Sequence, residues 1–192
     1  MTRLKSSIAL VLLAMLSLMA CAGSADPIKP VSGVDLPRYM GRWYVIASIP
    51  TRFERGGHNA VETYRRNPDG SICTWFRQRP DSFTAPVKLL HSSARVVPGS
   101  GNGEWRVRFF AFLTTQYLVG WLKPDYSQVM VVRDGRDYLW YMARTPAVPD
   151  GDYQAMLERA KALGYDVSKI EKVPQRWPET GEGSQTFAGA CP

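Results

Sequence analysis

The stretch Leu36–Tyr44, which reads L-P-R-Y-M-G-R-W-Y, lies between a low-complexity leader and the first segment that alternates like a strand. Gly41 lets the backbone bend or approach a neighbour closely. Trp43 carries a large ring that can close one end of a sheet that curls on itself. A plainer interpretation is a strand that begins with a core tryptophan. The segments that follow decide between a closed barrel and an ordinary sheet.

Eight short segments with strand-like alternation follow this stretch, all of them before the first helix-like pattern. Turn-forming sequences such as Asn67-Pro68-Asp69-Gly70 separate several of them, and such sequences favour hairpins. Closure removes exposed strand edges, so the pattern predicts an all-β, up-and-down antiparallel barrel whose interior holds one small ligand or is filled by side chains. The expected strands are residues 42–49, 58–66, 71–79, 87–97, 105–113, 114–122, 128–132 and 138–143.

A single helix is expected after the strands, packed on the outside of the barrel. Asp150 or Asp152 can cap its start, and Gly164 suits its C-terminal end. Residues 168–173 form a last strand candidate, and a tail over residues 175–192 carries no motif. The apolar stripe of the helix consists of Tyr153, Met156, Leu157, Ala160 and Leu163.

The composition indicates one globular domain: 192 residues, 45% hydrophobic and 21% charged. The net charge of +7 is scattered through the strand-like segments, so no nucleic-acid footprint is expected. The two histidines lie in strand patterns, and no nucleophile elbow, carboxylate pair or metal-ligand spacing appears. We therefore expect no catalytic residue, no metal and no cofactor.

Residues 1–20 have the pattern of a secretory signal peptide, with basic Arg3 and Lys5 before a short apolar run. The segment up to Cys21 resembles a bacterial lipoprotein box, which implies that Cys21 becomes the acylated N-terminus. Ala22 after it implies transfer to the outer membrane, with the protein facing the periplasm. Residues 21–33 have the composition of a tether. The alternative is an ordinary secreted protein.

The remaining cysteines are Cys73 and Cys191. An exported protein meets an oxidising compartment, where such a pair is a natural disulfide. The bond would attach the C-terminal tail to an early strand. Two free, buried thiols are the alternative.

Three separated motifs together resemble the lipocalin family, and in particular its bacterial outer-membrane lipoproteins related to apolipoprotein D. Gly41-Arg42-Trp43-Tyr44 matches the G-x-W motif of the first strand, and Pro124-Asp125-Tyr126 matches the second motif. Asp137–Pro146 (D-Y-L-W-Y-M-A-R-T-P) matches the motif of the last barrel strand, and Arg52–Gly56 is similar to the first loop of this subgroup. The resemblance covers residues 34–174, the expected barrel and helix.

The resemblance implies a floor made by Gly41, Trp43 and Arg144, with the guanidinium packed across the indole ring. It also implies a fatty acid or lysophospholipid ligand and a role in lipid binding, storage or transport at the envelope. A homodimer is left open. Strand parity gives the inward candidates for ligand binding. They are Val45, Ala47, Ile49, Phe109, Ala111, Tyr117, Val119, Trp121, Val129, Val131, Trp140 and Met142.

Alternatives stay open for several of these residues. Each wall residue can be plain barrel core or outer-face packing, and Arg52 or Arg55 can meet a carboxylate or phosphate or be a solvated loop residue. The chain can also be a lipocalin-like enzyme acting on a lipophilic substrate, or an interaction protein with a filled barrel.

We predict that the mature protein takes up two alkyl groups on Cys73 and Cys191 only after reduction, because a disulfide protects both thiols from alkylation. Mass spectrometry of the intact protein, alkylated with and without prior reduction, measures this directly. Uptake of both groups without reduction would show two free thiols and leave Cys73 available as a nucleophile.

Overall fold

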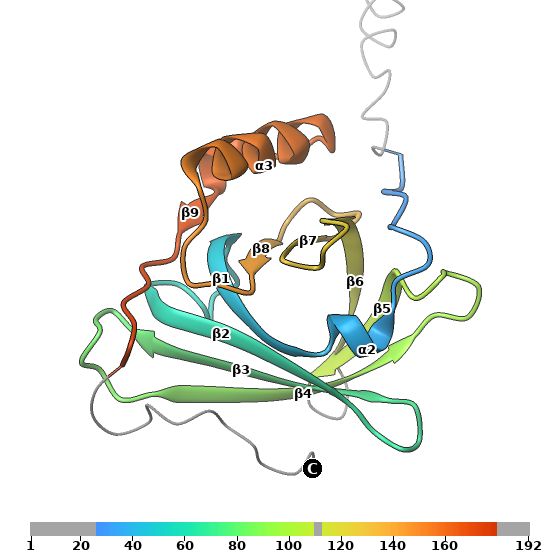
Figure 1. Cartoon of the computed structure of the whole chain (residues 1–192), viewed down its shortest axis with the longest axis horizontal. Coiled ribbons are helices and arrows are strands. Elements are labelled where there is room, and N and C mark those ends of the chain that lie inside the picture. Colours follow the sequence, from blue (N-terminus) through green and yellow to red (C-terminus); the bar gives the residue numbers. More distant parts are fainter. Residues whose placement is uncertain (1–25, 110–112, 180–192) are drawn as a thin grey trace, which may run out of the picture.

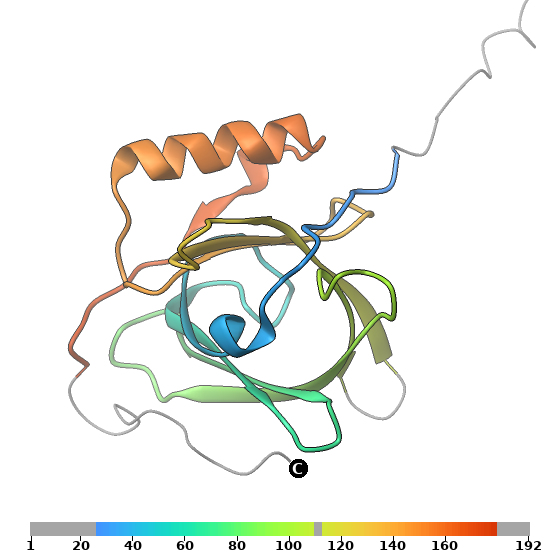
Figure 2. The same cartoon turned by 45° about the vertical axis from the view of Figure 1, so that its right-hand side comes forward.

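The computed structural model describes residues 26–109 and 113–179, and in it the expected eight-stranded barrel is confirmed. Each strand pairs antiparallel with the next, and β1 pairs with both β8 and β2, which closes the ring. Figure 2 shows this ring with a short helix inside its outline. The barrel strands are β1 (Gly41–Ile49), β2 (Gly57–Arg66), β3 (Ile72–Pro80), β4 (Lys88–Val96), β5 (Glu104–Phe109), β6 (Leu113–Leu122), β7 (Gln128–Val132) and β8 (Leu139–Ala143).

The short helix, α2 (Leu36–Tyr39), occupies the first half of the deciding stretch, where no helix was expected. Asp35 caps it, because its side chain accepts a hydrogen bond from the Arg38 N–H at 3.1 Å. Trp43 donates from Nε1 to the Tyr39 carbonyl at 2.9 Å, so the helix end is fixed against the start of β1. The helix lies across one end of the barrel and closes it (Figure 2).

Arg144, directly after β8, holds this closed end together. Its Cζ lies 3.7 Å from the centroid of the Trp43 ring, which confirms the predicted packing. Its guanidinium also donates to the carbonyls of Arg38, Tyr39, Met40 and Arg42, at 2.7 to 3.0 Å. The last carbonyls of a helix have no partner within it, so Arg144 satisfies groups that α2 leaves open.

The barrel wall separates two hydrophobic clusters. One lies inside the ring and contains Trp43, Tyr64 and Trp105. The other lies outside, between β1, β6, β7 and β8 and the helix α3 (Asp150–Ala162), as Figure 1 shows. Tyr153 and Met156 bury the inner face of α3 in it, so the single helix packed on the outside is confirmed.

Two expectations about the ends of α3 and the segment after it are wrong. Pro149 occupies the N-cap position, and because its side chain has no hydrogen-bond acceptor it does not cap the helix. Asp152 accepts hydrogen bonds from Gln128 and Lys123 instead. Residues 168–173 do not form one strand. They divide into a 3₁₀ turn, η1 (Val167–Lys169), and the two-residue β9 (Glu171–Lys172), which pairs with β1.

The segment over residues 26–35 runs along the outside of the barrel. The Arg136 guanidinium donates to the Asp26 carbonyl at 2.6 Å, next to the loop between β7 and β8. Val31 then bonds Val119 of β6, and Val34 bonds Gly101 near the closed end. Residues 26–33 were expected to form a tether, and this expectation is wrong. Their backbone bonds the barrel, and the Ile28 side chain packs in the outer cluster.

Residues 174–179, where the sequence offered no motif, cover the outer face of β2 and β3. Gln175 donates to two barrel carbonyls, and Trp177 packs edge-on against Tyr44 at 5.2 Å between centroids. The Glu179 carboxylate lies 2.7 Å from Arg77 and 3.2 Å from Arg79. Burial raises the pKa of Glu179, but hydrogen bonds from Arg77, Asn59 and Arg79 outweigh it and hold the pKa below its usual value.

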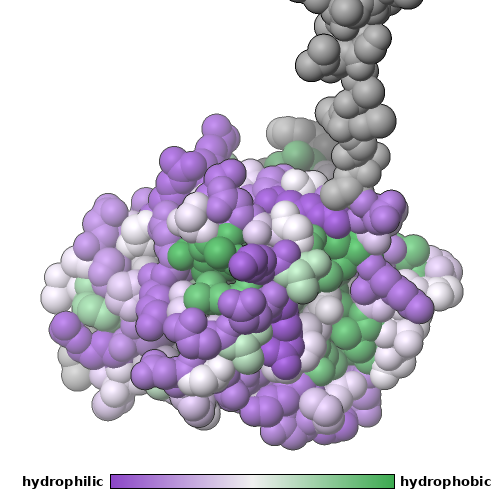
Figure 3. Space-filling view, turned by 90° about the horizontal axis from the view of Figure 1, so that it is seen from above, coloured by the Kyte–Doolittle hydropathy of each residue, from purple (hydrophilic) through white to green (hydrophobic). Residues whose placement is uncertain are grey.

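The surface seen from above is mainly hydrophilic, with apolar areas set between charged residues (Figure 3). Among residues 26–109 and 113–179, no helix is long and apolar enough to cross a membrane.

We predict that Arg144→Ala lowers the free energy of unfolding by about 2–4 kcal/mol, because partly buried carbonyls lose a charged donor and the Trp43 ring loses its cover. Urea denaturation measures this. The matched control is Arg95→Ala, which removes a surface pair with Asp69 whose arginine side chain is 70% exposed; we expect a loss below about 0.5 kcal/mol there. Equal losses in the two variants would contradict the assigned role of Arg144.

Candidate functional site

The closed end of the barrel is filled by an aromatic plug, which consists of Tyr39, Trp43, Tyr64, Trp105 and Tyr117. The Tyr117 ring stacks on Trp105 with centroids 4.6 Å apart and planes 5° apart. Its hydroxyl donates to Tyr64 at 3.0 Å and lies 2.6 Å from the Tyr39 hydroxyl. Burial raises the pKa of all three tyrosines, so their hydroxyls are neutral and bonded to one another.

Above the plug the inner wall is not fully packed. Leu90, Phe109 and Trp140 pack against the inner cluster, yet each keeps part of its surface accessible. Residues packed into a filled core lose nearly all of their accessible surface. The inner wall toward the end opposite α2 therefore keeps accessible apolar surface, and mostly apolar, concave sites are the ones that bind small molecules.

The loop between β1 and β2 forms one side of this open end. Glu54 in the loop accepts a hydrogen bond from Trp140 Nε1 at 3.1 Å and from the Thr51 N–H at 2.8 Å. Phe53 beside it is 51% exposed. Arg52 and Arg55 are exposed, and the Arg52 guanidinium lies 4.5 Å from the Phe53 ring centroid. The loop thus presents an apolar ring and two cations at the rim, and one acid turned to the wall.

Two half-buried acids affect the electrostatics of the interior. Burial raises the pKa of Glu54, although its bonds from Thr51 and Trp140 oppose the rise. Burial also raises the pKa of Glu62 well above its usual value, and the nearby Glu54 carboxylate adds to the rise. The interior therefore disfavours additional negative charge.

Eight of the predicted inward residues belong to the inner cluster or pack against it. Among them, Tyr117 is part of the plug, and Trp140 lies at the open end. Their role as ligand contacts stays a proposal. The eight are Val45, Phe109, Tyr117, Val119, Val129, Val131, Trp140 and Met142.

The prediction is wrong for Ala47, Ile49 and Trp121, which belong to the outer cluster beneath α3. A register shift between Val45 and Ala47 lets Ile46 and Ala47 both face the helix side, so strand parity reverses after it.

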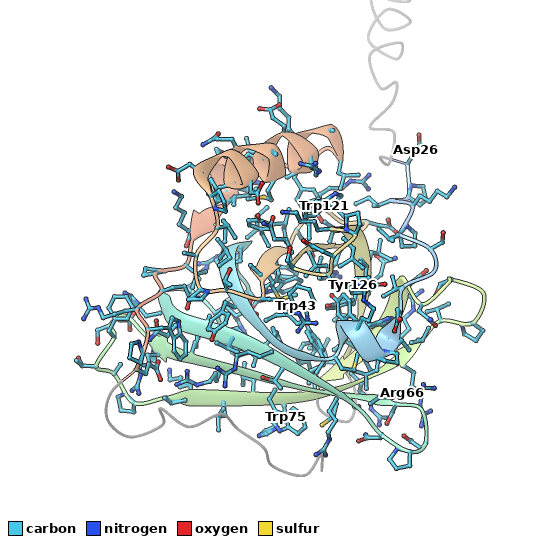
Figure 4. All side chains as sticks on the ribbon, viewed as in Figure 1. Asp26, Trp43, Arg66, Trp75, Trp121 and Tyr126 are labelled. Carbon is cyan, nitrogen blue, oxygen red and sulfur yellow. The ribbon has the colours of Figure 1, made fainter. Side chains whose placement is uncertain are left out.

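A second shift falls between Val119 and Trp121, at Gly120. A Cβ at Gly120 would meet Val132 Cγ2 at 2.5 Å. As a result Trp121 lies beneath α3 (Figure 4). The Arg159 guanidinium packs over its ring, 4.7 Å from the centroid. An isolated glycine within a strand pattern is a signal for such a bulge.

Several predicted sites lie outside the described residues: Ala111 of the wall, the lipidation site Cys21 and the disulfide partner Cys191. Cys73 lies buried in β3 and is not a free thiol. Its pairing with Cys191 stays a prediction.

Part of the inner wall was missed. Tyr64, Phe76 and Leu90 come from β2, β3 and β4 and face the interior with Glu62. Strand parity applied to residues 58–96 would have found them, as it did for the second half of the barrel. Glu62 was missed because a carboxylate in an alternating strand is ordinarily assigned to the solvent face.

The closed barrel, its plug and its single open end define a small-molecule-binding β-barrel, and sequence comparison gives its family. The sequence model of the lipocalin-like domain matches residues 34–175, so the chain belongs to the lipocalin family.

Temperature-induced lipocalin-1 of Arabidopsis thaliana is 35% identical over 160 residues, which cover 77% of this chain and 83% of that protein. Outer membrane lipoprotein Blc of Vibrio cholerae is 33% identical over 160 residues, with 83% and 93% covered. Insecticyanin from the tobacco hornworm Manduca sexta shares the fold, with a TM-score of 0.63 at 15% identity; the match covers 82% of this chain and 89% of that one.

We predict that Trp140→Ala weakens binding of the uncharged probe N-phenyl-1-naphthylamine by about 1–3 kcal/mol, because a wall aromatic at the open end is lost. Trp121→Ala, the matched control beneath α3, should leave binding unchanged and instead lower the free energy of unfolding by about 2–4 kcal/mol. Fluorescence titration and urea denaturation of both variants measure the two effects. Weaker probe binding by Trp121→Ala than by Trp140→Ala would contradict the assignment of the two faces.

Proposed function

We propose that this lipocalin binds and carries lipids or other small hydrophobic ligands at the bacterial cell envelope. The observation that carries the proposal is the apolar, incompletely packed wall above the aromatic plug, on which Leu90, Phe109 and Trp140 keep accessible surface. A plugged barrel offers one route of entry, and a ligand that enters is removed from water on all sides.

The proposed location rests on the leader sequence and on the relatives. Residues 1–21 resemble the leader of a lipoprotein, and the relative from Vibrio cholerae is named an outer membrane lipoprotein. An acylated Cys21 would give an anchor of several acyl chains, which holds stably to a membrane. We place the protein at the outer membrane, facing the periplasm.

The start of the described chain supports an orientation for such an anchor. Asp26 is bonded to Arg136 beside the β7–β8 loop, at the open end of the barrel, and Figure 4 labels its position. The five residue-to-residue steps from Cys21 to Asp26 span at most about 18 Å. An anchor at Cys21 therefore keeps the mouth of the barrel near the lipid surface, where an apolar ligand is collected or delivered.

Fatty acids and lysophospholipids are the ligand classes that the family resemblance suggested, and both carry an acyl chain that an apolar wall accommodates. The wall by itself supports the acyl chain and does not choose the head group. Catalysis on a lipophilic substrate and a filled barrel are the alternatives, and the experiment below separates them from carriage.

We predict that the protein purified from membranes carries a stoichiometric acyl-chain ligand and an N-terminus that begins at an acylated Cys21. Native mass spectrometry gives the mass of the complex, and lipid extraction identifies the ligand. The Cys21→Ser variant is the control: it should lose the acyl mass and the membrane association and keep the capacity to bind a lipophilic probe.

Three other outcomes have distinct meanings. An empty barrel that takes up no lipophilic probe would contradict the proposal and favour an interaction protein. Release of a chemically altered ligand would favour an enzyme. An unmodified N-terminus would contradict the anchor and leave ligand binding standing.

A further inference from the structure

Glu62 is a carboxyl group on the inner wall of the barrel. It is paired with Trp43 of β1 on one side and with Phe76 of β3 on the other, and both of these residues belong to the inner cluster. Directly paired residues in neighbouring strands project to the same face of the sheet, so the Glu62 side chain projects inward. Its side chain keeps part of its surface accessible, which places it against the open space and not within packed core.

Among residues 26–109 and 113–179, Glu62 has no hydrogen-bond or ion-pair partner, in contrast to Glu54. The Glu54 carboxylate accepts bonds from Thr51 and Trp140, which hold it to the wall. A carboxyl group removed from bulk water ordinarily has such partners, because burying a polar group without hydrogen bonds is unfavourable. An unpartnered carboxyl facing a binding space is therefore available to a ligand.

A second polar group faces Glu62 from the opposite wall. The hydrogen bond between the Tyr64 and Tyr117 hydroxyls joins β2 to β6 across the barrel. Glu62 lies two residues before Tyr64 on β2, and Thr115 lies two residues before Tyr117 on β6. Each therefore projects to the same inner face as its tyrosine, on the side of the open end. Thr115 Oγ1 is buried and has no hydrogen-bond partner within the described part of the chain. Two unsatisfied polar groups thus lie directly above the plug, at the bottom of the apolar space.

The surroundings of this polar pair disfavour negative charge. The acid Glu54 is the charged group that acts on Glu62, and it raises the pKa further after burial. The guanidinium of Arg144 lies beneath Trp43 and is bonded to backbone carbonyls, and Arg77 and Arg79 bond Glu179 on the outer face. A carboxylate placed at the bottom of the space would therefore meet an acid and no free cation among these residues.

We propose that the barrel binds its ligand head-inward, with a hydrogen-bond-donating alcohol or amine on Glu62 and Thr115, and that it discriminates against carboxylates at this position. The inference rests on the proposed function and names the head group that the site takes. An alcohol donates to Glu62 and accepts from Thr115, and an ammonium pairs with the Glu62 carboxylate. The alkyl chain then extends along the apolar wall toward Trp140.

The test compares three probes of one chain length near neutral pH: decylamine, 1-decanol and decanoate. Competition against N-phenyl-1-naphthylamine gives their affinities. We expect the amine and the alcohol to bind wild-type protein at least about tenfold more tightly than decanoate, because the burial and the Glu54 charge that raise the pKa of Glu62 also disfavour a ligand carboxylate at this place. Glu62→Gln should reduce the preference of decylamine over decanoate by about tenfold or more. Thr115→Val should weaken 1-decanol while keeping the order of decylamine and decanoate.

Glu171→Gln is the matched control, because it removes the same charge from an exposed position on β9 outside the barrel; it should change none of the three affinities. The proposal is overturned if decanoate binds wild-type protein as tightly as decylamine does, or if Glu62→Gln leaves their ratio unchanged. The ranking in wild-type protein decides the matter even where a variant folds poorly. Failure of all three probes and of N-phenyl-1-naphthylamine itself to bind would overturn the proposed function, whereas a preference for decanoate overturns this inference alone.

Discussion

The rest of the structure depends on the contacts that the Arg144 guanidinium makes at the closed end of the barrel. The guanidinium covers the Trp43 ring and donates to four carbonyls at the turn from α2 into β1. One side chain from the end of the barrel sequence thereby fixes the beginning of that sequence across one end of the ring. Arginine suits the task because its planar group stacks on an aromatic face and still donates several hydrogen bonds.

Because one end is closed, the two halves of the barrel interior differ in packing and in hydrogen bonding. Below, the tyrosine hydroxyls bond one another and the rings pack face to face and edge to face, so each of these hydroxyls already has a partner in the plug. Above, Glu62 and the Thr115 hydroxyl have no partner among the described residues. Many apolar residues of the wall contribute to the affinity for a ligand. Selectivity between head groups depends on the few polar groups that can bond the ligand.

The sequence predicted the barrel, its strand order and the packing of Arg144 on Trp43, because alternation, turn residues and the lipocalin motifs are local signals. It did not predict which face Ala47, Ile49 and Trp121 occupy. One inserted residue reverses the parity of everything after it, and a bulge depends on the partner strand as much as on the strand itself. Only Gly120 gave a local sign of it.

The segments outside the barrel were missed for a related reason. Residues 26–33 and 174–179 are rich in proline and polar residues and resemble linkers, yet they satisfy backbone and charged groups on the barrel surface. Such docking depends on partners distant in sequence, which no local pattern reveals. The same holds for Glu62, because its inward position is evident only from its neighbours Trp43, Phe76 and Thr115, which lie on other strands.

The direction of binding and the position of the anchor agree with one another. A lipid in a membrane has its head group at the surface and its chain beneath. The proposed anchor holds the open end of the barrel toward that surface, since the described chain begins beside the β7–β8 loop. A head-inward site then receives the lipid in the orientation it already has, head group first and chain following along the wall. A head-outward site would require the lipid to turn over between membrane and barrel, with its chain exposed to water during the turn, and exposed apolar surface costs about 25 cal/mol per Å².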